Sequence, residues 1–139
     1  MKLLIDPVQS FKATVAEIAN KLILYAKIYA SPKPLGDEKQ AVMSEDMRVL
    51  SSKLQSNMHL IPAYNISKYI FCLPSKQKFA TASRELIFIH NGHDSALENQ
   101  GILNCYAAQK VRISLGIYIP EGEYLDPINE ASFVKAKSN

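Results

Sequence analysis

The chain has 139 residues, of which 47% are apolar and 21% are charged, and it contains five glycines. This length suits one hydrophobic core, and this composition excludes collagen-like and strongly disordered proteins. The formal net charge of +3 comes from 16 basic and 13 acidic side chains that are scattered along the sequence. The absence of a dense basic run argues against a nucleic-acid-binding protein.

The N-terminal residues form too short an apolar run for a signal peptide or a membrane span. Leu3, Leu4 and Ile5 are followed at once by Asp6 and Pro7, whereas a spanning helix needs about 20 apolar residues. We therefore expect no membrane-spanning segment in this chain. Asp6 and Pro7 instead predict a helix start, because aspartate is a good N-cap and proline suits the first helical position.

A long first helix is predicted from its apolar stripe. Apolar residues recur at spacings of three and four, the period of a helix with one buried face, at Val8, Phe11, Val15, Ile18, Leu22, Tyr25 and Tyr29. Pro32, Pro34 and Gly36 end this helix, because residues before prolines are pushed out of the helical region.

The second helix is predicted from Asp37 or Glu38 to about Leu60, and its stripe includes Met43, Met47 and Met58. A core stripe is the simpler interpretation of this row. Methionine-rich faces also adapt to partner helices, so a protein-interaction surface is the alternative.

Two further helices are predicted after a short apolar piece at residues 66–73. Ser75 can cap a third helix that ends near Gly92, which we expect in a left-handed conformation. A fourth helix is expected from about residue 94 to Gly116. Four helices with short connections predict an all-α protein, either a four-helix bundle or an irregular helical array.

The helical domain is expected to span residues 1–120. It is followed by an extended, polar C-terminal tail over residues 121–139, partly ordered at most, which could dock through Ile128 and Phe133. Residues 117–120 are β-branched and aromatic, but this run is too short to indicate a sheet.

Two cysteines indicate the redox compartment. Cys72 and Cys105 lie in apolar surroundings and lack a C-x-x-C spacing. This context predicts two buried, reduced thiols and hence a reducing compartment, the cytoplasm.

The candidate metal ligands are His90, His93, Asp94 and Glu98. Two imidazoles and two carboxylates within nine positions could bind zinc or another divalent ion, if the turn at Gly92 brings them together. Their spacing differs from H-E-x-x-H, in which the histidines are four apart on one helix face. We favour structural roles, His90 at a helix end and Asp94 as an N-cap, and keep the metal site as the alternative.

Other catalytic signatures are missing from the sequence. No G-x-S-x-G elbow is present, the five glycines stand too far apart for a phosphate-binding loop, and neither cysteine has a basic neighbour. We therefore predict no cofactor and favour a protein that is not an enzyme.

Several short patterns in the chain resemble those of known proteins. The main ones are Asp6-Pro7-Val8-x-x-Phe11, Glu17-Ile18-Ala19, Leu22, Tyr25-Ala26, Tyr29 and Ser31-Pro32, and the weaker ones are Leu50 with Leu54, Ile61-Pro62, Leu73-Pro74-Ser75 and residues 82–87. With these residues the chain resembles the soluble part of uncharacterised bacterial membrane-anchored proteins. In such proteins one or two spanning helices precede the Asp-Pro start, so the resemblance implies a membrane-proximal location and supplies no active site.

The sequence thus predicts a non-enzymatic helical module that binds a protein partner, or itself, through an apolar helix face. Its expected location is the cytoplasm, as a peripheral protein at the inner surface of a bacterial membrane. The second interpretation is a metal-binding protein or metal-dependent enzyme built on His90, His93, Asp94 and Glu98. The third is a weak binder of nucleic acid through dispersed lysines.

Overall fold

The computed structural model describes residues 2–34, 36–61, 64–93 and 99–133, without the side chains of residues 2–5 and 65. Within these ranges the elements are α1 (Lys2–Leu24), α2 (Ala26–Ala30), α3 (Glu38–Leu60), α4 (Tyr64–Ile70), α5 (Lys76–His90), α6 (Gln100–Leu115), and the 3₁₀ helices η1 (Glu121–Glu123) and η2 (Pro127–Phe133). No strand occurs in the described ranges, and the all-α prediction is confirmed.

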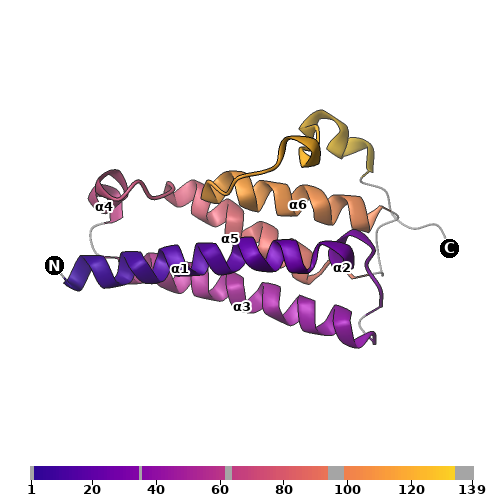
Figure 1. Cartoon of the computed structure of the whole chain (residues 1–139), viewed down its shortest axis with the longest axis horizontal. Coiled ribbons are helices and arrows are strands. Elements are labelled where there is room, and N and C mark those ends of the chain that lie inside the picture. Colours follow the sequence, from indigo (N-terminus) through magenta and orange to yellow (C-terminus); the bar gives the residue numbers. More distant parts are fainter. Residues whose placement is uncertain (1, 35, 62–63, 94–98, 134–139) are drawn as a thin grey trace.

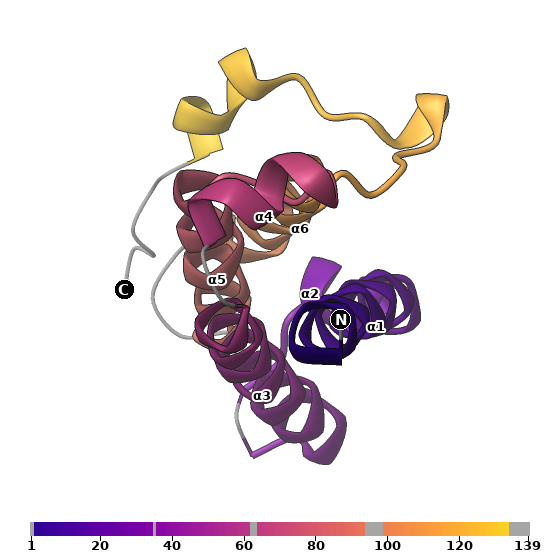
Figure 2. The ribbon, with the colours of Figure 1, turned by 90° about the vertical axis from the view of Figure 1, so that its left-hand side faces the viewer.

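The four long helices, α1, α3, α5 and α6, alternate in direction along the bundle (Figure 1). Helix α5 packs against both α3 and α6, and α1 packs against α3. Viewed along the bundle, these four helices surround the core, α4 lies across one end, and the C-terminal residues lie outside α6 (Figure 2). Among the described residues, no helix combines the length and the apolar content needed to cross a membrane.

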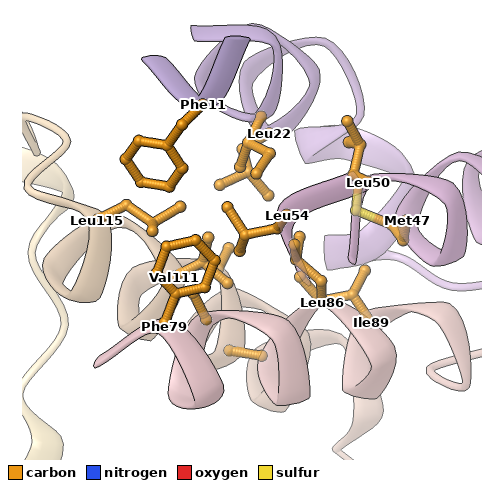
Figure 3. Close-up of a cluster of buried hydrophobic side chains, with 14 of the residues drawn as sticks. Phe11, Leu22, Met47, Leu50, Leu54, Phe79, Leu86, Ile89, Val111 and Leu115 are labelled. Carbon is orange, nitrogen blue, oxygen red and sulfur yellow. The ribbon is translucent and has the colours of Figure 1, made fainter. Parts of the chain in front are cut away.

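The core is built from the predicted stripes. Side chains from all four long helices converge there (Figure 3), and Leu22, Leu54 and Leu86 have no exposed surface. Met43 and Met47 are also fully buried, so the methionine row belongs to the core and the alternative of a methionine interaction surface is wrong for these two residues. Burial of each such side chain contributes about 1.5–3 kcal/mol.

Helix α1 begins earlier than the sequence indicates. It starts at Lys2 rather than after Asp6, and Pro7 lies inside it. Proline lacks an N–H, so Pro7 removes one helical hydrogen bond, but this loss falls close to the N-terminus, where few bonds depend on it. The cap predicted at Asp6 is therefore wrong.

The predicted first helix is also interrupted, at Tyr25. This residue leaves helical geometry with φ −96° and ψ 9°, and α2 begins after it. Two tyrosines stabilise the break: the Tyr25 hydroxyl donates to Asp46 on α3, and the Tyr29 hydroxyl donates to the Leu22 carbonyl oxygen at 3.0 Å. The second contact gives a partner to a carbonyl at the end of α1.

The cap predicted at Ser75 is confirmed, and Asp37, a predicted helix start, also caps its helix. The side chain of Asp37 accepts a hydrogen bond from the backbone N–H of Gln40 at 3.0 Å, and Ser75 accepts one from Lys78 at 3.2 Å. Each side chain supplies an acceptor to the first turn of its helix, α3 or α5.

The two helix-ending glycines have different roles. Gly116, the expected end of the fourth helix, adopts the left-handed conformation with φ 71°. Gly92 does not, and the left-handed conformation predicted for it is wrong. A Cβ at Gly92 would lie 2.2 Å from the Asn104 side chain, and the Asn104 amide donates to the Gly92 carbonyl oxygen at 2.9 Å. Gly92 is therefore needed for the close approach of α6.

Residues 117–133, which we call the C-terminal strap, run back along α6 (Figure 1). The Gln109 side chain donates to the Leu125 carbonyl oxygen at 2.8 Å and accepts from the Leu125 N–H at 2.7 Å. The ring of Phe133 contacts that of Tyr106, with 6.3 Å between centroids, whereas Ile128 is 85% exposed. Phe133 thus docks as expected and Ile128 does not.

Candidate functional site

Helix α4 is held to the bundle by one face. Tyr64 and Ser67, three residues apart, are both buried. The Tyr64 hydroxyl donates to the Pro74 carbonyl oxygen at 2.6 Å, and its ring meets the core residue Phe79 edge-on at 6.0 Å. Burial raises the pKa of Tyr64 to about 12, so this hydroxyl keeps its proton and remains a donor at neutral pH.

The opposite face of α4 is apolar as well. Ile66, Tyr69 and Ile70 are spaced i, i+3 and i+4, which places them on one side of the helix, and they are 64%, 78% and 64% exposed. Leu60 is the last residue of α3 and is 63% exposed, and α3 ends at the end of the molecule where α4 lies (Figure 1). We call these four residues the α4 end surface. A cluster of exposed apolar residues on one short helix is typical of a contact site.

The charges around the α4 end surface have one sign. The Lys68 ammonium lies 5.2 Å from the centre of the Tyr69 ring, and Lys76 and Lys78 are exposed at the start of α5. Residues 47–84 include six lysines and arginines and no aspartate or glutamate. Arg48, Lys53 and Arg84 pair with glutamates that lie outside this range. Among the described residues, Lys68, Lys76 and Lys78 form no ion pair, so they supply the positive charge near the exposed apolar side chains.

A tight backbone motif ends α4. Cys72 adopts the left-handed conformation with φ 55°, and the N–H of Leu73 donates to the Lys68 carbonyl oxygen at 2.9 Å. This is the hydrogen bond of a Schellman cap, in which glycine is the usual residue at the left-handed position. The motif turns Cys72 outward, so the prediction that it is buried is wrong, while Cys105 is half-buried.

The predicted metal ligands are only partly described. His90 lies at the end of α5, half-buried, and its Nδ1 donates to the Ser44 carbonyl oxygen at 2.6 Å. His93 is half-buried beyond that helix, and Asp94 and Glu98 lie outside the described residues. Over residues 2–34, 36–61, 64–93 and 99–133, no three His, Cys, Asp or Glu side chains are placed to hold a metal ion. His90 thus links α5 to α3, and a metal site that uses Asp94 and Glu98 stays a prediction.

The sequence indicated the α4 end surface only weakly. Residues 66–73 form a short apolar piece in the sequence, but seven helical residues are too few to show which face is buried. A second signal was available in the charge distribution, because residues 47–84 lack acidic side chains. Together the two signals point to an apolar, basic end.

Comparison with known proteins does not identify a relative. No family model, no curated protein and no solved structure matches this chain. The resemblance to membrane-anchored bacterial proteins therefore stays a prediction. The class that the fold defines is an all-α helical bundle.

Proposed function

We propose that this protein is a non-enzymatic helical interaction module that docks on an anionic membrane surface through the α4 end surface. The observation that carries the proposal is the exposure of Ile66, Tyr69 and Ile70 on one face of α4. The opposite face of this helix is already buried in the bundle. The exposed face is thus available to an external partner.

The size of the surface favours a bilayer over a protein partner. A stable protein interface uses about 20–30 residues on each side, whereas the α4 end surface offers four apolar side chains. A bilayer interface needs only a few, because burial of an isoleucine contributes about 1.5–3 kcal/mol. Tyrosine also favours the headgroup region, where its ring is buried and its hydroxyl is hydrated.

Charge supports the same partner. Each lysine near an anionic bilayer contributes about 1 kcal/mol. Lys68 lies on α4 itself, and Lys76 and Lys78 are exposed in the first turn of α5, which follows α4 in the chain. Lysine can place its stem on apolar surface while its ammonium stays in water. Anionic lipids are characteristic of the cytoplasmic leaflet, so the proposal implies a peripheral protein at the cytoplasmic face of a membrane.

Co-sedimentation of the full chain with vesicles tests the proposal. We expect binding to vesicles that contain phosphatidylglycerol, weak binding to phosphatidylcholine alone, and loss of binding at high salt. The double variant Tyr69→Ser/Ile70→Ser should lose binding. The matched control Tyr124→Ser/Ile128→Ser removes the same residue types from the strap, where they are 55% and 85% exposed, and should bind like the unmodified protein.

Two outcomes would overturn the proposal. One is equal binding of both double variants to phosphatidylglycerol vesicles. The other is an oligomer, detected by sedimentation without lipid, that the Tyr69→Ser/Ile70→Ser variant disrupts while vesicles fail to bind. That second result would assign the α4 end surface to self-association, the kind of partner expected from the sequence.

A further inference from the structure

A cavity of about 460 Å³ lies between α2, α6 and the C-terminal strap, far along the chain from α4. Small side chains line it on both helices, Ala26 and Ala30 on α2 and Ala108 on α6. Ile119 and Leu125 of the strap complete the apolar lining. Cavities of this size with mostly apolar walls are typical of small-molecule sites.

The cavity contains one strongly charged donor, Arg112. Its side chain is only 13% exposed, and its Nη1 lies 3.6 Å from Oε2 of Glu123, whose side chain is 61% exposed. A guanidinium presents five N–H donors in a planar fork suited to a carboxylate. The Glu123 carboxylate is exposed and lies 3.6 Å from one guanidinium nitrogen. Most of the N–H donors of Arg112 therefore remain available to another anion.

The space continues past Arg112. A second cavity of about 230 Å³ adjoins the first and shares Ile23, Arg112 and Glu123 with it. The guanidinium therefore stands between two largely apolar spaces. This arrangement matches a ligand with a negative head and an apolar chain.

We propose that this cavity binds a small monocarboxylate with an apolar chain, such as a medium-chain fatty acid. Arg112 pairs with the ligand carboxylate, and the chain lies against the alanines and against Ile119 and Leu125. Glu123 competes with the ligand for Arg112 and so weakens binding. The site is separate from the α4 end surface and does not depend on membrane docking.

Isothermal titration calorimetry of the full chain with decanoate tests this proposal. We expect one site that binds decanoate more tightly than 1-decanol, which has the same chain without the charge. Arg112→Met should weaken decanoate binding about tenfold or more, whereas Arg84→Met, which removes a 72% exposed arginine elsewhere, should not change it. Tyr69→Ser/Ile70→Ser should also bind decanoate normally.

Glu123→Gln keeps the test decisive even if Arg112→Met does not fold. This variant removes the competing carboxylate at an exposed position and should tighten decanoate binding. Unchanged affinity in Glu123→Gln, equal binding of decanoate and 1-decanol, or no binding to the unmodified protein would each overturn the proposal.

Discussion

Helix α4 and the C-terminal strap both lie outside the four long helices, and both carry exposed apolar side chains. They differ in charge and in attachment. The strap, residues 117–133, has four acidic residues and no lysine or arginine, and it pairs with basic residues of α6, as in the 2.7 Å contact of Glu130 with Lys110. Residues 47–84, which include α4, have basic residues and no acidic ones.

This difference explains why one segment is proposed as a docking surface and the other is not. The acidic strap finds its counter-charges within the chain, on Lys110 and Arg112. The α4 end surface has no acidic residue close in sequence to neutralise it. Exposed Tyr124 and Ile128 lie among acidic neighbours, which would repel an anionic bilayer.

The largest expected loss of stability concerns the contacts that attach α4 to the bundle. Tyr64→Ala removes a buried ring, its contact with Phe79 and its hydrogen bond to Pro74. The free energy of unfolding should fall by about 3 kcal/mol, measured by urea denaturation. Tyr118→Ala, which removes an 80% exposed tyrosine from the strap, should change it by less than about 0.5 kcal/mol. Equal losses would mean that α4 is no better anchored than the strap.

A smaller loss of stability is expected when the hydrogen bonds between Gln109 and the strap are removed. Gln109→Ala removes both hydrogen bonds to the Leu125 backbone and should cost about 1–2 kcal/mol. Hydrogen exchange should accelerate at the Leu125 amide while core amides of α5 keep their protection. Uniform acceleration across the molecule would show that the strap and the core unfold together.

Helix α6 ends in the same motif as α4, because the N–H of Ile117 donates to the Arg112 carbonyl oxygen at 2.8 Å. Substitutions at the left-handed residues of these two Schellman caps should change stability in opposite directions. Cys72 and Gly116 both have positive φ, but only Gly116 is the residue that this conformation favours. Gly116→Ala should lower the free energy of unfolding by about 1 kcal/mol or more. Cys72→Gly should raise it by up to about 1 kcal/mol, measured in the same denaturant series. A loss of stability in Cys72→Gly would contradict the assignment of strain to Cys72.

The smallest expected change in stability depends on pH and concerns Glu85. Burial raises the pKa of Glu85 on α5, Lys110 and Arg84 oppose this shift, and Glu130 of the strap adds to it. Because the folded-state pKa exceeds the unfolded value, the protonated carboxyl stabilises the fold at low pH. This contribution declines as pH rises from the unfolded pKa towards the folded one.

Glu85→Gln should therefore raise the free energy of unfolding at neutral pH. The gain should shrink below about pH 4, near the unfolded pKa of glutamate. Urea denaturation at both pH values checks this, and a gain of equal size at both would exclude the ionised carboxylate as the cause.

The sequence predicted features that depend on local rules. The stripes of α1, α3 and α5 follow the helical period, and the caps at Asp37 and Ser75 need only a side chain and the next turn. The break at Tyr25 was not predictable, because it is stabilised by Asp46, 21 residues away. The path of the strap likewise depends on Gln109, 16 residues before Leu125.

The α4 end surface could not be derived from periodicity, because a seven-residue helix gives no reliable stripe. Its exposure depends on which face Tyr64 anchors to Phe79, a tertiary contact. The contact of His90 Nδ1 with the Ser44 carbonyl oxygen was likewise not predictable, because the two residues are 46 positions apart in the chain. The metal site with His93, Asp94 and Glu98 stays a prediction, because Asp94 and Glu98 lie outside the described residues.

The most direct test of membrane docking uses the absence of tryptophan from the chain. Tyr69→Trp places a single fluorophore on the α4 end surface, and Tyr124→Trp places one on the strap. On addition of phosphatidylglycerol vesicles, the emission of Tyr69→Trp should shift to the blue and be quenched by brominated lipid, while that of Tyr124→Trp should not change. A shift in Tyr124→Trp alone, or in neither variant, would contradict docking through α4.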